Sequence, residues 1–237
     1  MKNYVIILAG GIGSRMNSDI PKQFIEVDNK PIIVHTIERF EKHNQIEKIL
    51  IVCVKEWIDY LKELVDKYNL DKVKWIIEGG NTGHDSIRNG VFFLKDKIDE
   101  DDHVIVHDAV RPVLPKKAID EVIRVSHEKG NASSSIACHP PIVYTDDFES
   151  GISDVDREHV MLTASPQAFK YSLALECYEM AEKDDRHDFT FTSSLLIHYK
   201  KRVYFAKGTT CNIKVTTKED LALFEALLRI PEELLYS

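Results

Sequence analysis

The sequence is short of the residues that build metal centres, disulfide scaffolds and membrane spans. Its four cysteines lie at positions 53, 138, 177 and 211, and no two of them have CxxC spacing, which argues against a zinc site or a disulfide framework. No apolar run approaches the about 20 residues that cross a bilayer. The N-terminus has one lysine and then an apolar run that leads into glycines, so we expect a strand there and no signal peptide. A reducing cytoplasm is the expected setting.

Positive charge is also scarce. The chain carries 31 lysines and arginines against 39 aspartates and glutamates, a formal net charge of −8. This balance argues against nucleic acid or a membrane surface as a general partner. An anionic substrate would therefore need a local group of cations. Hydrophobic residues make up 43% of the 237 positions, which suffices for one folded domain over residues 1–237.

Short apolar runs alternate with amphipathic stretches along the chain. The runs are rich in β-branched residues and do not alternate strictly, as is typical of strands buried on both faces of a parallel sheet. We expect strands over 4–9, 48–54, 73–79, 102–109, 134–138 and 203–208, and helices over 31–43, 56–69, 84–97, 115–129 and 217–230. This order predicts an α/β fold with a doubly wound, mostly parallel sheet.

One stretch departs from this alternation. Residues 139–169 carry proline, glycine, serine and aspartate without a long periodicity. An irregular segment of this length inside a compact domain is usually functional or forms a protruding arm. We therefore expect one domain with an arm inserted in it.

The first apolar run ends in a glycine-rich turn that matches neither of the common phosphate-binding motifs. A P-loop requires Lys-Ser or Lys-Thr after its glycines, and the turn lacks that pair. A dinucleotide fingerprint, GxGxxG, finds its first two glycines in Gly11 and Gly13, but Met16 stands where the third is required. An NAD-dependent oxidoreductase is therefore a weak alternative.

The same turn nevertheless suits a polyphosphate. Its glycines allow backbone N–H groups to approach a ligand. Arg15 offers a planar fork for phosphate oxygens, and Lys22, in the sequence Pro-Lys-Gln, offers a mobile charge. The alternative is an ordinary tight turn followed by solvated cations. The combination of glycines, arginine and lysine favours the phosphate site.

Polar residues also follow the other predicted strands, where ligands of open α/β sheets bind. Gly80 and Ser86 follow the third strand, and Asp108 and Arg111 follow the fourth. Asp108 suits Mg²⁺ or a ribose hydroxyl, and Arg111 suits a phosphate. Lys214 lies between Ile213 and Val215, so it is either a snorkelling edge residue or a cation directed at a ligand.

Histidines give a weaker signal. His103 and His107 are four residues apart, but on a strand this spacing separates them by about 13 Å. We interpret them as strand residues that hold no metal. His84 follows the third strand and is an uncertain neighbour of the site.

Taken together, these residues resemble the CTP-dependent cytidylyltransferase family that acts on 2-C-methyl-D-erythritol 4-phosphate and ribitol 5-phosphate. The resemblance extends over nearly the whole chain and depends on the order and spacing of several motifs. They are LAGGIGSRM (8–16), PKQF (21–24), GGNTGHDSI (79–87), VHDAVRP (106–112), Asp-Arg (156–157), SPQAF (165–169) and NIKVTTKEDL (212–221). The resemblance implies a Rossmann-like nucleotidyltransferase sheet and a homodimer that exchanges β-arms, here residues 139–165.

The resemblance also assigns roles. Arg15 and Lys22 would hold the triphosphate of CTP, and Lys214 would contact its α-phosphate; these three form the catalytic set. Asp108 would lie beside the nucleotide and a Mg²⁺ ion. The nucleotide-binding set comprises Leu8, Ala9, Gly10, Gly11, Gly13, Gly80, Asn81, Ser86, Asp108 and Ala109. The acceptor polyol phosphate would be held by Arg111, Thr190 and, from the partner's arm, Arg157.

The departures from the family pattern concentrate on the acceptor side. Asn81 replaces a frequent aspartate and Gly83 a common arginine, while Phe191 and Thr192 replace an Asp-Glu pair after the pocket threonine. The Asp-Thr pair of the methylerythritol enzymes has no clear counterpart in residues 140–145. The N-terminal half is closer to the ribitol enzymes. We therefore favour ribitol 5-phosphate as acceptor and keep methylerythritol phosphate, or another polyol or sugar phosphate, as alternatives. A nucleotide-binding module without turnover is a further alternative.

Overall fold

The computed structural model describes residues 1–11 and 20–236. Its main sheet has seven strands in the order β11-β7-β10-β6-β1-β4-β5. The strands are β1 (Asn3–Ala9), β4 (Ile46–Cys53), β5 (Val73–Glu78), β6 (His103–Asp108), β7 (Asn131–Ala137), β10 (Met161–Lys170) and β11 (Phe205–Lys207). All neighbouring pairs are parallel except those of β10, which is antiparallel to both β6 and β7. The predicted doubly wound, mostly parallel sheet is confirmed.

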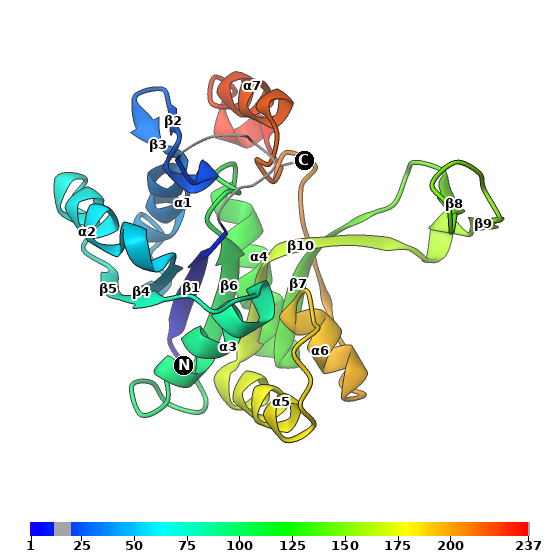
Figure 1. The fold of residues 1–237 in the computed structure, drawn as a ribbon, viewed down its shortest axis with the longest axis horizontal. Coiled ribbons are helices and arrows are strands. Elements are labelled where there is room, and N and C mark those ends of the chain that lie inside the picture. The colour runs from blue at the N-terminus through cyan, green and yellow to red at the C-terminus, as the bar shows by residue number, and fades with distance from the viewer. Residues whose placement is uncertain (12–19, 237) are drawn as a thin grey trace.

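Helices cover both faces of this sheet (Figure 1). They are α1 (Ile32–Glu41), α2 (Ile58–Lys67), α3 (Gly83–Phe93), α4 (Lys116–Lys129), α5 (Tyr171–Lys183), α6 (Thr192–His198) and α7 (Lys218–Leu227). Short 3₁₀ helices are η2 (Lys22–Phe24), η3 (Lys55–Trp57), η4 (Arg157–His159) and η5 (Glu232–Leu234). Within the described residues, no helix is both long and apolar enough to span a bilayer.

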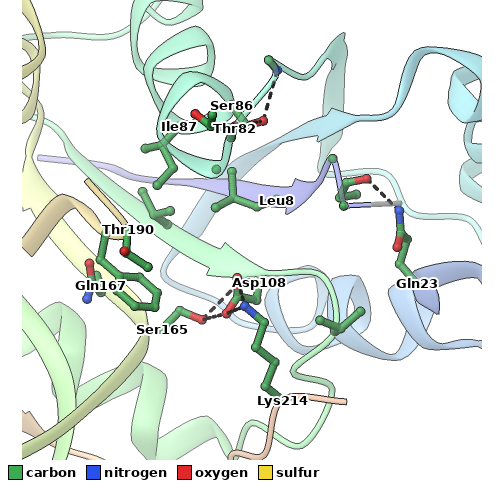
Figure 2. A pocket seen from close by; sticks show the side chains of 18 of the residues that line it. Leu8, Gln23, Thr82, Ser86, Ile87, Asp108, Ser165, Gln167, Thr190 and Lys214 are labelled. Carbon is green, nitrogen blue, oxygen red and sulfur yellow. Dashed lines mark hydrogen bonds and ion pairs between the residues drawn. The ribbon is translucent and has the colours of Figure 1, made fainter. Parts of the chain in front are cut away.

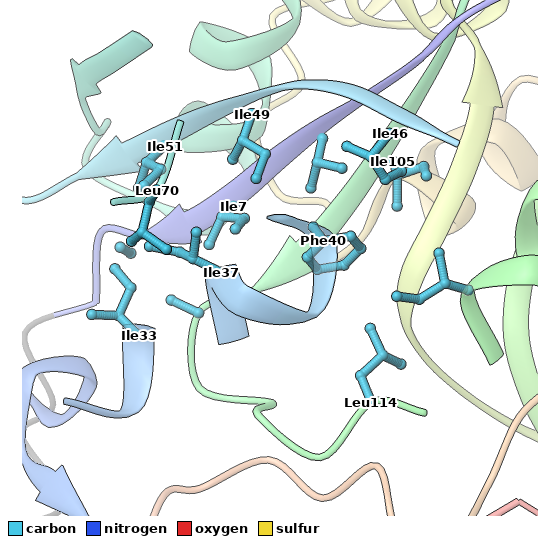
Figure 3. Close-up of a cluster of buried hydrophobic side chains, with 14 of the residues drawn as sticks. Ile7, Ile33, Ile37, Phe40, Ile46, Ile49, Ile51, Leu70, Ile105 and Leu114 are labelled. Atoms are coloured by element: carbon cyan, nitrogen blue, oxygen red, sulfur yellow. The ribbon is translucent and has the colours of Figure 1, made fainter. Parts of the chain in front are cut away.

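Alternation along the strands divides the core into two layers. Ile7 and Ile51 point to the face that packs against α1, α2 and α4, where Ile37 and Phe40 fill the space (Figure 3). Ile6 on the same strand points to the opposite face, which packs against α3, α5 and α6. Burial on both faces explains why these strands read as continuous apolar runs in the sequence. A third cluster packs α7 against the hairpin of β2 (Glu26–Val27) and β3 (Lys30–Pro31).

The stretch expected to be irregular over residues 139–169 is only partly so. Its last part, from residue 161, is β10, which lies between β7 and β6 inside the main sheet. The strand was missed because its sequence, MLTASPQAFK, is rich in residues with little strand preference, and pairing on both sides overrides that preference. Helices α5 and α6 also lie where the sequence suggested no element.

The remainder of that stretch projects from the domain. Strands β8 (Ile142–Tyr144) and β9 (Ser153–Val155) pair only with each other among the described strands, and Figure 1 shows this hairpin well away from the sheet. Its apolar side chains are exposed: Tyr144 by 61% and Phe148 by 94%. The exchange of such arms between two chains stays a prediction.

Candidate functional site

A cavity of about 370 Å³ opens beyond the carboxyl ends of β1 and β6. From β1 the chain leads one way to β4 and β5, and β6 lies on its other side, so this is the point where the strand order reverses. Open α/β sheets bind ligands in such a crevice. Figure 2 shows the side chains that line it.

One side of the cavity is built from backbone. Ala9 ends β1, Gly10 and Gly11 follow it, and Gly80 follows β5. A Cβ atom on Gly80 would overlap the Cβ atom of Asp85, so only glycine lets this loop lie against α3. The loop is held by Ser86, whose Oγ donates to the carbonyl of Thr82 (2.9 Å) and accepts from the N–H of Gly80 (3.1 Å).

The first turn of α3 is closed by a capping box. Thr82 Oγ1 accepts from the N–H of Asp85 at 3.1 Å, and the Asp85 carboxylate accepts from the N–H of Thr82 at 3.1 Å. These bonds satisfy orphan donors at the helix N-terminus. Thr82 itself lines the cavity, so the positive end of the helix dipole is fixed beside the ligand space.

Lys22 reaches the cavity from η2, and a glutamine fixes that short helix. Gln23 is 1% exposed, and its Nε2 donates to the carbonyl of Ala9 at 2.8 Å (Figure 2). This bond ties the segment after the glycine turn to the end of β1. Lys22 and Gln23 both line the cavity.

Asp108 forms the charged centre of the opposite side. Its carboxylate lies 2.9 Å from Arg111 Nε and 3.4 Å from Lys214 Nζ. Ser165 Oγ accepts from the N–H of Asp108 at 3.1 Å (Figure 2). Burial alone would raise the pKa of Asp108, but Lys214 and then Arg111 outweigh burial and lower it. Asp108 is therefore an anion at neutral pH.

The side chain of Lys214 lies at the cavity beside Asp108, and its role as a cation directed at a ligand stays a prediction. It lies in a segment without strand structure, which the Val215 N–H anchors to the carbonyl of Val110 at 2.9 Å. Its side chain is 36% exposed and lines the cavity.

Behind Asp108 lies a buried histidine. His107 Nε2 is 3.0 Å from the carbonyl of Arg111, which can only accept, so Nε2 carries the proton. Burial lowers the pKa of His107 to about 4, so the ring is neutral at neutral pH. This ring supports the turn that carries Arg111 and does not line the cavity.

The structure brings most of the predicted site residues to this cavity. Those that line it are Leu8, Ala9, Gly10, Gly11, Lys22, Gly80, Asn81, Ser86, Asp108, Thr190 and Lys214. Gly13 and Arg15 lie outside the described residues.

Three predicted residues lie elsewhere. Ala109 is 1% exposed, and its backbone is engaged by Leu8 and Thr36, so it does not line the cavity. Arg111 lines a second cavity. Arg157 lies in the arm, where its guanidinium donates to the carbonyl of His139 at 2.6 Å. His84, an uncertain candidate, is buried on the far side of α3, against Tyr178 and Phe189.

Several lining residues were missed by sequence reasoning. Besides Gln23 and Thr82, they include Ser165, Gln167 and Phe191. The signal for Ser165 and Gln167 was present in the SPQAF motif, but β10 was not recognised as a strand of the sheet. Gln167 is 2% exposed, and its Nε2 donates to Ser193 Oγ at 3.0 Å, which ties β10 to the first turn of α6.

Comparison with known proteins gives a consistent result. Residues 3–230 match the family model of IspD, 2-C-methyl-D-erythritol 4-phosphate cytidylyltransferase. The chain is 38% identical to a ribitol-5-phosphate cytidylyltransferase of Lacticaseibacillus paracasei, over 96% of this chain and 98% of that relative. It is 37% identical to a 2-C-methyl-D-erythritol 4-phosphate cytidylyltransferase of Clostridium botulinum, over 96% and 97% respectively. The crystal structure of the Francisella tularensis IspD has a similar fold: the TM-score is 0.82 at 24% identity, over 96% of this chain and all of that one.

Proposed function

The chain belongs to the IspD family of cytidylyltransferases, and from this premise we propose that it transfers CMP from CTP to a polyol phosphate, in the first place D-ribitol 5-phosphate. Pyrophosphate is the second product. One observation carries the proposal: Lys22 and Lys214 line the same cavity as the glycine turns and an ionised Asp108. Such a cavity is suited to a nucleoside triphosphate.

The reaction requires no general base. An oxygen of the acceptor phosphate forms a bond to the α-phosphorus of CTP, and the bond from that phosphorus to the oxygen that bridges to the β-phosphate breaks. The attacking oxygen is already an anion. Among the described residues that line the cavity, none is a histidine or cysteine and Asp108 is the sole carboxylate. The chemistry therefore depends on positioning and on fixed cations, which offset the repulsion between two polyanions.

The cations divide between the two ends of the triphosphate. Lys214 lies at the end of the cavity that holds Asp108 and is suited to the α-phosphate, where charge develops. Lys22, and Arg15 outside the described residues, are suited to the β- and γ-phosphates that leave. The backbone at Gly10 and Asn81 is suited to provide further N–H donors for the nucleotide.

The residues present also fit a Mg²⁺ ion. This ion typically takes one or two carboxylates together with substrate phosphates and water, and Asp108 supplies one ionised carboxylate at the cavity. In the described part of the chain there is no group of three or more histidine, cysteine or acidic side chains that would form a complete protein cage. When bound, the ion would neutralise phosphate charge, and Asp108 would hold it together with the nucleotide.

Ribitol 5-phosphate is favoured by the ribitol enzyme at 38% identity, and methylerythritol 4-phosphate is the second candidate because a relative of that activity reaches 37%.

We further propose a homodimer in which each arm contributes to the site of the other chain, and a cytoplasmic location. The exposed apolar residues on the arm support the homodimer, and the four unpaired cysteines support the cytoplasmic location.

A pyrophosphate-release assay tests the function. Wild-type protein with CTP and Mg²⁺ should release pyrophosphate with ribitol 5-phosphate and less, or none, with methylerythritol 4-phosphate and glycerol 3-phosphate. The reverse preference would assign the second acceptor. Tight binding of CTP without pyrophosphate from any acceptor would make the protein a nucleotide-binding module and overturn the proposal.

A further inference from the structure

Lys22 lies on a 3₁₀ helix that depends on its surroundings for its orientation. Helix η2 has three residues and no side-chain cap, and it contains a bond from the N–H of Ile25 to the carbonyl of Lys22 at 3.2 Å. Hydrogen bonds of a 3₁₀ helix have poorer geometry than those of an α-helix. The place of Lys22 at the cavity therefore depends on how the two residues that follow it are held.

Those two residues, Gln23 and Phe24, anchor η2 at different points. Gln23 is bonded to the carbonyl of Ala9, at the end of β1. Phe24 is 3% exposed, and its ring stacks on the ring of Trp57, with centroids 4.8 Å apart and planes inclined by 17°. Trp57 belongs to η3, which follows β4. The second anchor thus comes from a segment that the proposed chemistry does not use.

A third ring completes an aromatic cluster. Tyr60 of α2 meets Phe24 and Trp57 edge-on, with centroids 5.5 Å and 5.6 Å away. Offset stacking and edge-to-face contact are the arrangements that aromatic rings prefer. None of the three rings is among the described residues that line the cavity. The cluster can therefore act on a ligand only through η2.

Trp57 occupies a position where a different residue would serve the local structure better. It is the N-cap residue of α2, and its side chain makes no capping hydrogen bond. Serine, threonine, aspartate or asparagine at an N-cap stabilises the helix by accepting from a free backbone N–H. The contacts of Trp57 with Phe24 and Tyr60, rather than the needs of α2, account for a tryptophan here.

We propose that Trp57 is a positioning residue for the triphosphate: its ring holds Phe24, and thereby η2, so that Lys22 meets the β- and γ-phosphates. This assignment rests on the nucleotide site of the proposed function. A cation that is fixed in place before the substrate arrives matters because a misplacement of about 1 Å can cost about 100-fold in rate. Since Lys22 is proposed for the β- and γ-phosphates alone, Trp57 should influence the binding of CTP and not that of CMP.

Calorimetric titration with CTP and with CMP tests the proposal without turnover. Trp57→Leu should raise the Kd for CTP about tenfold and leave the Kd for CMP within about twofold. Trp57→Phe keeps a ring that can stack and should restore the wild-type Kd for CTP. Trp75→Leu is the matched control. Trp75 is the other tryptophan of the chain and is also half-buried, but it packs on Phe93 at 6.0 Å, so both Kd values should stay unchanged.

A double variant shows whether Trp57 acts through Lys22. Lys22→Ala should weaken CTP binding, and adding Trp57→Leu should weaken it no further, because residues that act through one contact are not additive. Additive losses would overturn the proposal, and so would equal losses of CTP and CMP affinity in Trp57→Leu.

Failure of the proposed function is seen separately. Wild-type protein that binds CTP but releases no pyrophosphate with any acceptor would overturn the transferase activity, while the Kd values still decide the role of Trp57. Wild-type protein that does not bind CTP would overturn both.

Discussion

Asp108 is the residue that balances charge at the meeting point of the two cavities. Its carboxylate contacts Arg111 and Lys214 while only 13% of its side chain is exposed. A buried carboxylate without those cations would bind a proton, and those cations without the carboxylate would repel each other. The triad thus holds two cations close together until polyanionic substrates arrive.

Removing Lys214 should abolish turnover while the fold stays intact. We expect Lys214→Ala to lower kcat by about 10³-fold or more, in the range known for charged groups that stabilise phosphoryl transfer. The circular dichroism spectrum should not change, because the side chain is 36% exposed. Lys170→Ala is a matched control: that lysine pairs with Asp101 at 2.6 Å and is 41% exposed, at the opposite end of the sheet. Equal losses in both variants would contradict the role of Lys214.

At the scale of elements, the first turn of α3 contacts two loops. Thr82 and Ser86 face the cavity, whereas His84 packs against Phe189 on the loop that leads to Thr190, with ring centroids 5.7 Å apart. Neither ring nitrogen of His84 has a hydrogen-bond partner among the described residues, so the ring acts there as a packing surface. One helix end therefore positions both the loop that we propose for the nucleotide and the loop that we propose for the acceptor phosphate.

Shortening the side chain of His84 should loosen only the loop that carries Phe189 and Thr190. We expect His84→Ala to raise the acceptor KM about tenfold and the CTP KM much less, because a cavity opens under Phe189. His84→Phe should restore the wild-type value, since packing rather than hydrogen bonding is required.

His103→Ala controls for general destabilisation. That ring is also buried, 3% exposed, but lies at the start of β6, away from both cavities. An equal rise in acceptor KM in this control would show that His84 has no specific part in holding the loop.

For the molecule as a whole, buried histidines set the response to acid. Burial lowers the pKa of His103 and of His107 from an ordinary value of 6.5 to about 4. Between those values the unfolded chain binds protons that the folded chain does not. Stability therefore rises with pH over this window and is lost as pH falls through it.

Urea unfolding should reveal this dependence. From pH 7 to pH 5 the free energy of unfolding should fall by about 2 kcal/mol for each of His103 and His107. His103→Gln should make the fall smaller, because it removes one of the two groups that bind a proton on unfolding. A free energy of unfolding that is constant between pH 7 and pH 5 would contradict these pKa shifts.

The whole-molecule scale also includes the proposed dimer. If the arm serves the partner, Lys214→Ala and Arg157→Ala homodimers are each impaired, but a mixed dimer regains one site with both residues intact. Co-refolded variants should then recover activity, with about a quarter of all sites functional after random pairing of two-fold dimers. No recovery on mixing would mean that Arg157 serves its own chain or has no role in the site.

The sequence by itself determined the α/β class, the strands that are buried on both faces, and the glycine-rich turns that follow β1 and β5. These features depend on local patterns: a strand buried on both faces is apolar along its length, and a glycine turn is visible in a few residues. The SPQAF motif was visible as well, yet its place in the sheet was not.

Tertiary structure alone decided where the polar groups meet. Asp108 and Lys214 are 106 residues apart in the chain and touch only after the sheet has formed. Strand β10 has weak intrinsic preference and exists because β6 and β7 pair with it on both sides. Hydrogen bonds to Asp108 and to the carbonyl of Asn212 likewise hold Arg111 at a second cavity, whereas Thr190 lines the first. Contacts between distant segments, rather than local spacing, fix the direction of each side chain.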